Sequence, residues 1–390
     1  MENPGVFAFP DLERVITGTP AAEAVSAEVE RLGGTAAFIL ASRTLNRETA
    51  VVEDLRLVLG RRYVGFDDAI PAHTPRDRVV AAANAARAAG TDIVITIGGS
   101  TLADAGKMVK LCLANNVREF EDLEPLRRVI HADGRENVPG MTPPTMPSIH
   151  VPTTLSGAEF YHSAGCTNPR LNRKEGFTHA KMIPQCVILD PAVTRHTPEW
   201  LWLSTGVRAV DHAVEGLCSV RPHPISDGLA IHALRLLPRA LKRCKAAPDD
   251  LDARFDCQIG MWASMMRSYA GVPFGASHGI GHVLGGTAKV PHGMTSCVLL
   301  PHVLHYNKAV NAGRQALVSE AMGDVATDAA DAVAGLIEDL GLPGRLRDVG
   351  VRRADFAVIA ANAMHDHAVH ANPRKIHRPD DVLEILEMAW

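Results

Sequence analysis

Short apolar runs alternate with longer amphipathic segments through the first half of the chain. Each run is apolar over almost its whole length, which predicts a strand buried on both faces. The segments between the runs carry apolar residues at helical spacing. The expected strands are 36–41, 92–97, 149–152 and 186–190, and the helices that separate them are 44–59, 75–89 and 102–115. This alternation predicts an α/β domain with a Rossmann-like parallel sheet covered by helices on both faces.

Beyond about residue 191 the pattern changes to helical periodicity alone. The helices expected there are 198–220, 226–244, 251–268, 310–340 (with a break near Gly313) and 379–390. We therefore predict an α/β domain over residues 1–192 and an all-α domain over 193–390, with the boundary near 191–197. Residues 124–147 are rich in Pro, Gly and charge and are expected to form an ordered loop.

Composition narrows the class of protein without indicating an activity. Of the 390 residues, 46% are hydrophobic and 22% are charged, as in ordinary globular proteins. The net charge of −4 favours neither a nucleic-acid nor a membrane partner. The seven cysteines are dispersed without a C-x-x-C pair, which fits reduced thiols. With no signal-peptide pattern and no membrane-length apolar run, we expect a cytoplasmic protein that acts on a small molecule.

Two hydroxyl-rich turns follow predicted strands. Gly98-Gly99-Ser100-Thr101 stands between a strand and a helix, where glycines let the backbone approach a phosphate and helix N–H groups point at it. The alternative is a tight turn without a ligand. Pro152-Thr153-Thr154 follows the strand at 149–152 and could close over the same cofactor, although such a motif is more often a helix N-cap.

Three histidines near the three-quarter point of the chain are the strongest chemical signal. His278 and His282 are one helical turn apart and share a helix face. His292 follows the Gly285-Gly286 pair and Pro291, where the chain can fold back. Converging imidazoles can hold a divalent metal with an open position, or they can handle protons beside a substrate.

Together, these motifs resemble the iron-containing (group III) alcohol dehydrogenase superfamily, and they occur in family order along nearly the whole chain. The motifs are Gly98-Gly99-Ser100-Thr101-x-x-Asp104-x-x-Lys107, Pro152-Thr153-Thr154, His278-x3-His282-x-Leu284-Gly285, Pro291-His292-Gly293 and Leu300-Pro301-His302. Residues 283–287, 372–374 and 386–390 are most similar to the maleylacetate reductase branch. The resemblance implies the dehydroquinate synthase-like fold of iron-type alcohol dehydrogenases, a cofactor cleft between the two domains and, we expect, a homodimer.

The resemblance also implies a set of cofactor-binding residues for NAD(H) or NADP(H). Many family members carry an Asp after the first strand that excludes a 2′-phosphate, whereas this chain has Ala41-Ser42-Arg43. NADPH should therefore be tolerated, and the choice between the two cofactors stays open. The candidates are Ser42, the pyrophosphate loop Gly98, Gly99, Ser100 and Thr101, Asp104 near the nicotinamide or its ribose, Thr153 and Thr154 along the cofactor, and Lys174 at the ribose.

The metal site that the family implies is altered in this chain. Metal-dependent relatives use Asp-x3-His plus two later histidines, so the ligands map to His212, His278 and His292, but Arg208 occupies the Asp position. An arginine offers only donors, and at 4 Å it would repel each unit of positive charge by about 4 kcal/mol at an effective dielectric near 20. Asp211, about 100° around the helix from His212, is expected to face elsewhere. Three histidines can still bind iron or zinc, but the maleylacetate reductase branch also lacks the Asp, and we favour a metal-free site.

These residues predict a reductase with a specific division of roles. Arg208 would hold a carboxylate or polarise a carbonyl oxygen, and His278 or His282 would supply a proton, with His212 and His292 completing the catalytic group. The alternative for Arg208 is an ordinary ion pair with Asp211 or Glu215. We predict an NAD(P)H-dependent, maleylacetate reductase-like enzyme that reduces a small carboxylate-bearing carbonyl compound. Two other functions stay open: an iron- or zinc-dependent alcohol dehydrogenase, and a non-catalytic nucleotide-binding sensor.

Overall fold

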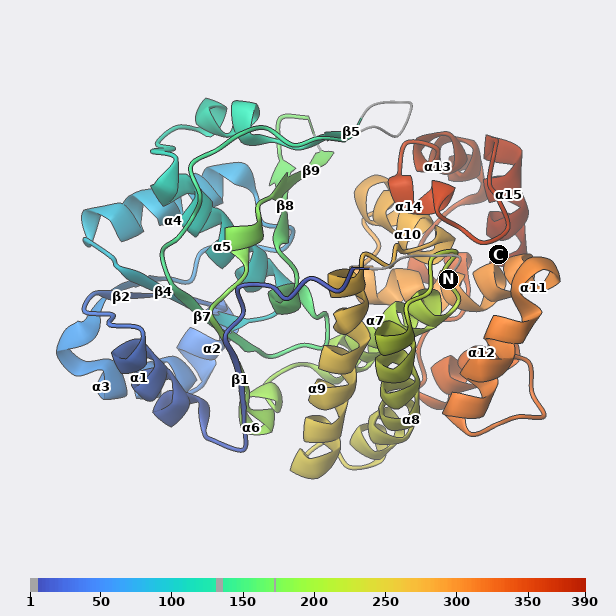
Figure 1. Cartoon of the computed structure of the whole chain (residues 1–390), viewed down its shortest axis with the longest axis horizontal. Helices are drawn as coiled ribbons and strands as arrows, with labels where there is room; N and C mark the ends of the chain where they lie inside the picture. The colour runs from blue at the N-terminus through green and yellow to red at the C-terminus, as the bar shows by residue number, and fades with distance from the viewer. Residues whose placement is uncertain (1–5, 131–135, 172) are drawn as a thin grey trace. The chain divides into compact units, whose positions relative to one another are not determined.

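The computed structural model describes residues 6–130, 136–171 and 173–390, which form two compact units (Figure 1). The α/β unit comprises residues 9–129 and 136–197. The helical unit comprises residues 198–390 together with the described residues 6–8 and 130. The predicted combination of a Rossmann-like parallel sheet and a helical C-terminal part is confirmed.

The α/β unit is built on a six-stranded parallel sheet in the order β1-β10-β7-β4-β2-β3. The strands are β1 Arg14–Thr17, β2 Ala37–Ala41, β3 Tyr63–Asp67, β4 Ile93–Gly98, β7 Ser148–Pro152 and β10 Cys186–Leu189. Two-stranded sheets pair β5 Val129–Ile130 with β6 Glu136–Asn137, and β8 Ser163–Asn168 with β9 Arg173–Thr178.

Helices cover both faces of this sheet, and the side chains of the central strands divide between them. Along β2, Phe38 and Leu40 enter one apolar cluster with α4 and α5, while Ile39 enters a second cluster with α1 and α3. Figure 1 shows these two pairs of helices on opposite sides of the sheet. The helices of the unit are α1 Ala21–Arg31, α2 Arg43–Glu48, α3 Val51–Leu59, α4 Arg76–Ala88, α5 Ser100–Ala114 and α6 Pro191–Thr194.

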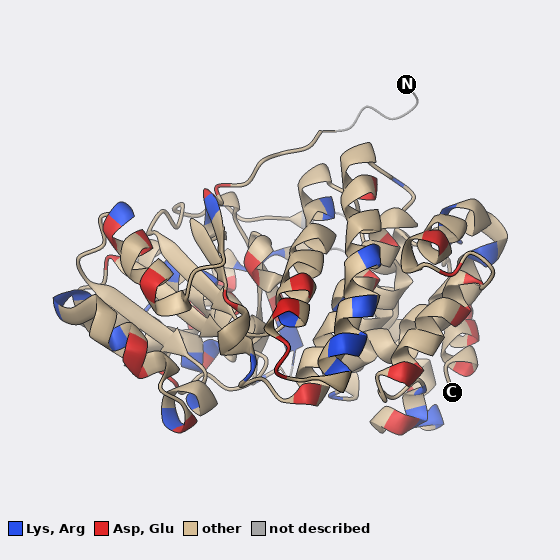
Figure 2. Cartoon of the chain, turned by 90° about the horizontal axis from the view of Figure 1, so that it is seen from below, with Lys and Arg blue, Asp and Glu red and all other residues tan. Residues whose placement is uncertain are grey.

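The helical unit packs nine helices. They are α7 Glu199–Leu217, α8 Pro224–Ala246, α9 Leu251–Met265, α10 Ala276–Thr287, α11 His292–Met322, α12 Ala329–Asp339, α13 Phe356–Ala363, α14 His367–His370 and α15 Pro379–Met388, among the residues that the structure describes. None of the helices in the described ranges is long and apolar enough to cross a membrane. Acidic and basic positions are interspersed along the elements (Figure 2).

Three expectations about individual elements were wrong. Residues 44–59 form two helices, because Thr49 is extended and its hydroxyl donates to the Leu45 carbonyl at 2.6 Å. The helix expected at 310–340 is two helices separated by a turn at Gly323, and the first begins already at His292 with Pro301 inside it. The non-helical backbone of Asn311 nevertheless lies close to the break predicted near Gly313. The Gly285-Gly286 pair does not end α10, which continues to Thr287.

Gly106 lets α5 pack closely onto the sheet. A Cβ atom at this position would overlap Thr96 Cγ2 and lie 3.2 Å from His150 Nε2. We expect Gly106→Ala to lower the free energy of unfolding by about 1–3 kcal/mol, because both neighbours are buried and cannot give way. Urea denaturation followed by circular dichroism measures this.

Gly228 in α8 provides the matched control, since a Cβ atom there would have no neighbour within 4 Å. Gly228→Ala should stabilise the protein by up to about 1 kcal/mol through helix propensity. A Gly106→Ala protein as stable as the wild type would show that α5 is not packed as described.

Candidate functional site

The glycine-rich turn lies at the carboxyl end of β4, at the centre of the sheet. Gly98 ends the strand with a φ of +151°, which L side chains rarely adopt, and α5 begins at Ser100. The backbone N–H of Ser42 donates to the Ile97 carbonyl at 3.1 Å, so the end of β2 lies alongside. After β2 the chain adds β3 on one side of it, whereas β4, β7 and β10 are added on the other side. The strand order therefore reverses between β2 and β4, and α/β sheets bind ligands at the carboxyl end of such a switch point.

The structure brings the second hydroxyl-rich turn to the first. The N–H of Thr153 donates to the Gly98 carbonyl at 3.0 Å, and a Cβ atom on Gly99 would lie 3.0 Å from Thr154 Cγ2. Thr153 and Thr154 precede a bend rather than a regular helix, so the helix N-cap alternative does not apply. A glycine-lined backbone, a helix N-terminus and two threonines therefore border one position, which fits the pyrophosphate of a dinucleotide.

Asp104 and Lys174 lie in the same region of the α/β unit. The carboxylate of Asp104 pairs with Lys107 Nζ at 2.9 Å and accepts from the Gly165 N–H at 3.1 Å. The Lys174 side chain lies over Gly165, because a Cβ atom there would be 2.8 Å from Lys174 Nζ. Asp104 thus anchors β8 to α5, and its expected contact with the nicotinamide stays a prediction.

In the helical unit, α7 presents a polar stripe within a buried helix. Arg208, Asp211, His212 and Glu215 follow one another at steps of three, one and three residues, so they share an arc of about 100°. Arg208 Nη1 donates to Ser296 Oγ at 3.1 Å and is 3.9 Å from Asp211 Oδ2. The expectation that Asp211 faces elsewhere was wrong. Viewed along the helix, Arg208 lies between Asp211 and His212, so all three side chains point to the same face.

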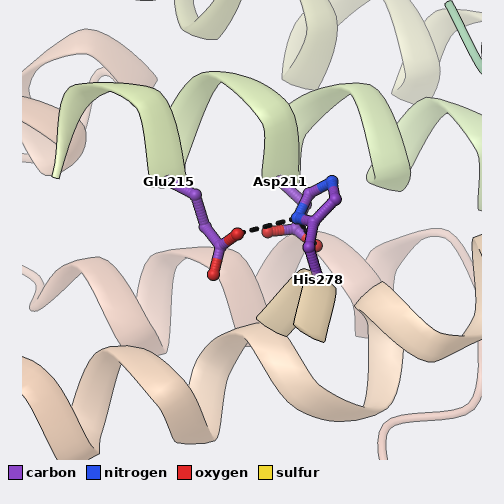
Figure 3. A group of neighbouring side chains, drawn as sticks. All are labelled: Asp211, Glu215 and His278. Carbon is purple, nitrogen blue, oxygen red and sulfur yellow. Dashed lines mark hydrogen bonds and ion pairs between the residues drawn. The ribbon is translucent and has the colours of Figure 1, made fainter. Parts of the chain in front are cut away.

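Asp211 and Glu215 converge on His278 of α10 (Figure 3). His278 Nδ1 is 2.7 Å from Glu215 Oε2 and 3.5 Å from Asp211 Oδ2. Glu215 also accepts the N–H groups of Gly275 and Ser277, at 2.9 and 2.8 Å, and so caps the start of α10. Burial and the nearby Asp211 raise the pKa of Glu215 to about 8. Sequence reasoning treated Glu215 as structural and missed its contact with His278.

Four imidazoles form a continuous row beside Arg208. The ring centroids are 5.0 Å apart for His212 and His278, 6.4 Å for His278 and His282, and 6.3 Å for His282 and His292. The glycine at position 281 allows this packing, since a Cβ atom there would lie 2.9 Å from the Thr295 hydroxyl and 3.7 Å from the Arg208 guanidinium. All five residues predicted to be catalytic are therefore neighbours in the helical unit.

The buried part of this row is neutral and incompletely hydrogen-bonded. Burial lowers the pKa of His212 and His278 well below the ordinary value, and the Arg208 charge lowers both further. Within the described residues, His212 Nδ1, His278 Nε2 and Asp211 Oδ1 are buried without a hydrogen-bond partner. Because such atoms are costly to leave unpaired, they mark a position where a polar ligand is expected.

The residues present do not fit a divalent metal well. Asp211, Glu215 and His278 offer ligand atoms within 4.8 Å of one another. However, Glu215 already accepts two backbone N–H groups, and Asp211 Oδ2 accepts the hydroxyls of Ser277 and Ser296 at 2.8 and 2.6 Å. In addition, Arg208 places a fixed positive charge at this group. Metal binding would have to overcome that repulsion and displace these hydrogen bonds.

The outer histidine of α10 has a different carboxylate partner. His282 Nδ1 is 2.8 Å from Asp366 Oδ2, and Asp366 also caps α14 by accepting the N–H of Ala368 at 2.9 Å. Asp366 was not among the predicted site residues. The only signal for it in the sequence was its place among the late histidines 365, 367 and 370.

A parallel sheet with a glycine-rich turn at its switch point, and a buried histidine–arginine group in a helical unit, fit an oxidoreductase that uses a dinucleotide, and the comparisons with known proteins show the same class. The family model described as iron-containing alcohol dehydrogenase matches residues 13–191, and that of the C-terminal region of the same family matches residues 202–390. The chain belongs to the iron-containing alcohol dehydrogenase family, whose members use NAD(P)H and usually iron and act on small molecules.

Named relatives act on several different substrates. The chain is 35% identical to dehydrogenase FUM7 of Gibberella moniliformis, over 95% of both chains. It is 30% identical to lactaldehyde reductase of Escherichia coli, over 96% of this chain and 97% of the relative. Its structure superposes on maleylacetate reductase from Agrobacterium tumefaciens with a TM-score of 0.83, at 26% identity and covering 100% and 98% of the two chains.

Proposed function

We propose that the protein is an NAD(P)H-dependent reductase of small carbonyl compounds that carry a carboxylate, and that it works without a metal. The observation that supports this most directly is the buried Arg208 guanidinium, 8% exposed, beside buried imidazole nitrogens that have no hydrogen-bond partner among the described residues. A buried cation that hydrogen-bonds a serine and is 3.9 Å from one carboxylate retains donors for an anionic ligand.

In this proposal, residues of the α/β unit bind the cofactor, and residues of the helical unit bind and protonate the substrate. In the α/β unit, the turn at 98–101 and the pair Thr153-Thr154 would hold the pyrophosphate of the dinucleotide. When bound, a reduced nicotinamide supplies the hydride. In the helical unit, Arg208 would bind the substrate carboxylate or the oxygen that gains negative charge, and a histidine of α10 would provide the proton for that oxygen.

An NADH and NADPH oxidation screen over keto acids and aldehydes of matched size tests the proposal. We expect measurable turnover, with keto acids preferred over the corresponding aldehydes, and no requirement for an added metal. Turnover restricted to neutral aldehydes would contradict the substrate class. Tight cofactor binding without turnover on any compound would instead support the nucleotide-sensor function.

A metal-dependent alcohol dehydrogenase is the second candidate, because His212 Nδ1 and His278 Nε2 are buried without partners in the described structure. The hydrogen bond between His278 Nδ1 and Glu215 also resembles the support given to many metal-binding histidines. We nevertheless expect protein purified without chelator to contain substoichiometric iron and zinc and to keep its activity in EDTA. Stoichiometric metal, lost together with activity on chelation, would establish the second candidate instead.

A further inference from the structure

The two histidines of α10 differ in what their hydrogen-bond partners allow. We propose that Asp366 is a positioning residue that holds His282 with its proton on Nδ1, so that Nε2 of His282 is the atom that gives the reacting proton to the substrate oxygen. This inference rests on the proposed reductase function. It selects between His278 and His282, which the motif alone leaves equivalent.

Asp366 is fixed from two sides. Its Oδ1 accepts the Ala368 N–H at 2.9 Å, and its Oδ2 is 2.8 Å from His282 Nδ1. Burial would raise the pKa of Asp366, but nearby His282 and His367 and the hydrogen bonds from His282 and the Ala368 N–H together hold it below the ordinary value. An ionised carboxylate only accepts hydrogen bonds, so Nδ1 of His282 must donate, and Nε2 is the remaining ring atom that can exchange a proton.

His278 is held differently. Its Nδ1 is 2.7 Å from Glu215 Oε2, and the two side chains are only 1% and 6% exposed, so solvent does not reach this pair. His282, by contrast, has 41% of its side chain exposed and is paired with a carboxylate. Of the two, His282 is therefore the ring that both solvent and a substrate can reach.

The fold brings Asp366 to His282 through a glycine. A Cβ atom on Gly279 would lie 2.8 Å from the backbone nitrogen of Val369, so only glycine lets α14 pack this closely against α10. That packing places Asp366 beside His282, although 84 residues separate them in the sequence. The two glycines of His278-Gly-Ile-Gly-His282 thus allow close packing against different helices. Gly279 lies against α14, and Gly281 lies against α11.

The proton balance of the step is simple. When the substrate carbonyl carbon accepts a hydride, its oxygen gains an electron pair and needs one proton. The Nε2–H bond of protonated His282 breaks and the O–H bond of the product forms. The imidazole that remains is neutral, with its proton on Nδ1 donated to Asp366, and it is recharged from solvent. The Asp366 carboxylate stabilises the protonated ring before the transfer and fixes its orientation during it.

The nitrogen NMR spectrum of the histidine side chains tests the assignment without requiring activity. In the wild type, the neutral form of His282 should carry its proton on Nδ1, with the signals assigned by their loss in His282→Gln. In Asp366→Asn, the amide oxygen is needed by the Ala368 N–H, so the NH2 group faces His282 and should move the proton to Nε2. A wild-type His282 with its proton on Nε2, or a spectrum that Asp366→Asn does not change, would overturn the proposal.

Kinetics separate positioning from stability. We expect Asp366→Asn and Asp366→Ser to lower kcat by about 100-fold or more with little change in KM, because general acid catalysis contributes about 10²–10⁴-fold. Serine retains the helix cap but cannot reach His282. Adding His282→Gln to either variant should cause no further loss. Additive losses, or a loss confined to Asn while Ser retains full activity, would count against positioning.

Asp250→Asn is the matched control, since Asp250 caps α9 by accepting the Ala253 N–H at 2.9 Å and is partly exposed, away from the histidine row. This variant should keep the wild-type kcat. If the wild type reduces no carbonyl compound at all, the proposed function fails on that result, whereas the NMR spectrum still decides which nitrogen of His282 carries the proton.

Discussion

Arg208→Ala is expected to lower kcat/KM for a keto acid about 100- to 1,000-fold more than for a neutral aldehyde of the same size, because loss of one partner from a buried charge pair costs about 3–5 kcal/mol. The guanidinium is buried beside His212 and His278, where a substrate carboxylate would lose its water and need a cation. A neutral aldehyde needs only polarisation of its carbonyl oxygen, so loss of Arg208 should lower kcat/KM less for the aldehyde than for the keto acid. Stopped-flow or steady-state NAD(P)H oxidation with paired substrates measures the ratio.

Two comparisons make this experiment specific. Arg208→Lys keeps the charge but loses the forked donor geometry, and it should lie between the wild type and Arg208→Ala for the acid. Arg243→Ala removes an exposed arginine of the same unit and should leave both substrates unaffected. Equal losses for acid and aldehyde in Arg208→Ala would show that Arg208 does not bind the carboxylate.

The centre of the α/β unit was predictable because its strands are buried on both faces. β2 is apolar throughout and β4 is interrupted only by Thr96 before its final glycine, and such runs indicate the interior of a parallel sheet. The edge strands β1 and β3 were missed, since each has one free side and partly exposed residues that break the apolar pattern. The start of the long helix α11 was placed wrongly because Pro301 argues against a helix, whereas tertiary packing overrides that preference.

The candidate site was predictable where its residues are close in sequence. Arg208, His212, His278 and His282 lie at helical spacings, and the structure brings them together. The same spacing rule, applied from Arg208 rather than from His212, would also have found Asp211 and Glu215 on that face. Asp366 could not have been found in this way, because its contact with His282 depends on how closely α14 approaches α10, and that depends on tertiary packing at Gly279.

The ionic arrangement around Arg208 supports the proposal of a metal-free site. In the position where the family resemblance implies an anionic ligand, this chain carries a cation, and Asp211 lies 3.9 Å away as its counter-charge. Burial raises the pKa of Asp211, while Arg208 and the hydroxyls of Ser296 and Ser277 oppose that effect. Under the proposed function, the internal guanidinium takes the electrostatic role that a bound cation would otherwise have.

Arg208→Asp should consequently create a metal site. The change removes one positive charge and adds one negative charge at the position four residues before His212, and each unit charge contributes about 4 kcal/mol toward a unit of metal charge at 4 Å and an effective dielectric near 20. We expect zinc or cobalt to bind stoichiometrically with His212, His278 and His292, and to raise the melting temperature of the variant but not of the wild type. Isothermal titration calorimetry and metal analysis measure both.

Two further variants define what this experiment means. Arg208→Asn removes the positive charge without adding a ligand, so it should bind zinc more weakly than Arg208→Asp and more tightly than the wild type. Adding His212→Ala to Arg208→Asp should abolish the gain, because the Asp-x3-His pair is then broken. If Arg208→Asp binds no metal, repulsion by the Arg208 guanidinium is not the reason why the site lacks a metal ion. Wild-type protein that binds zinc as tightly as the variant would show that the site tolerates the arginine, and the metal-dependent function would then be the better one.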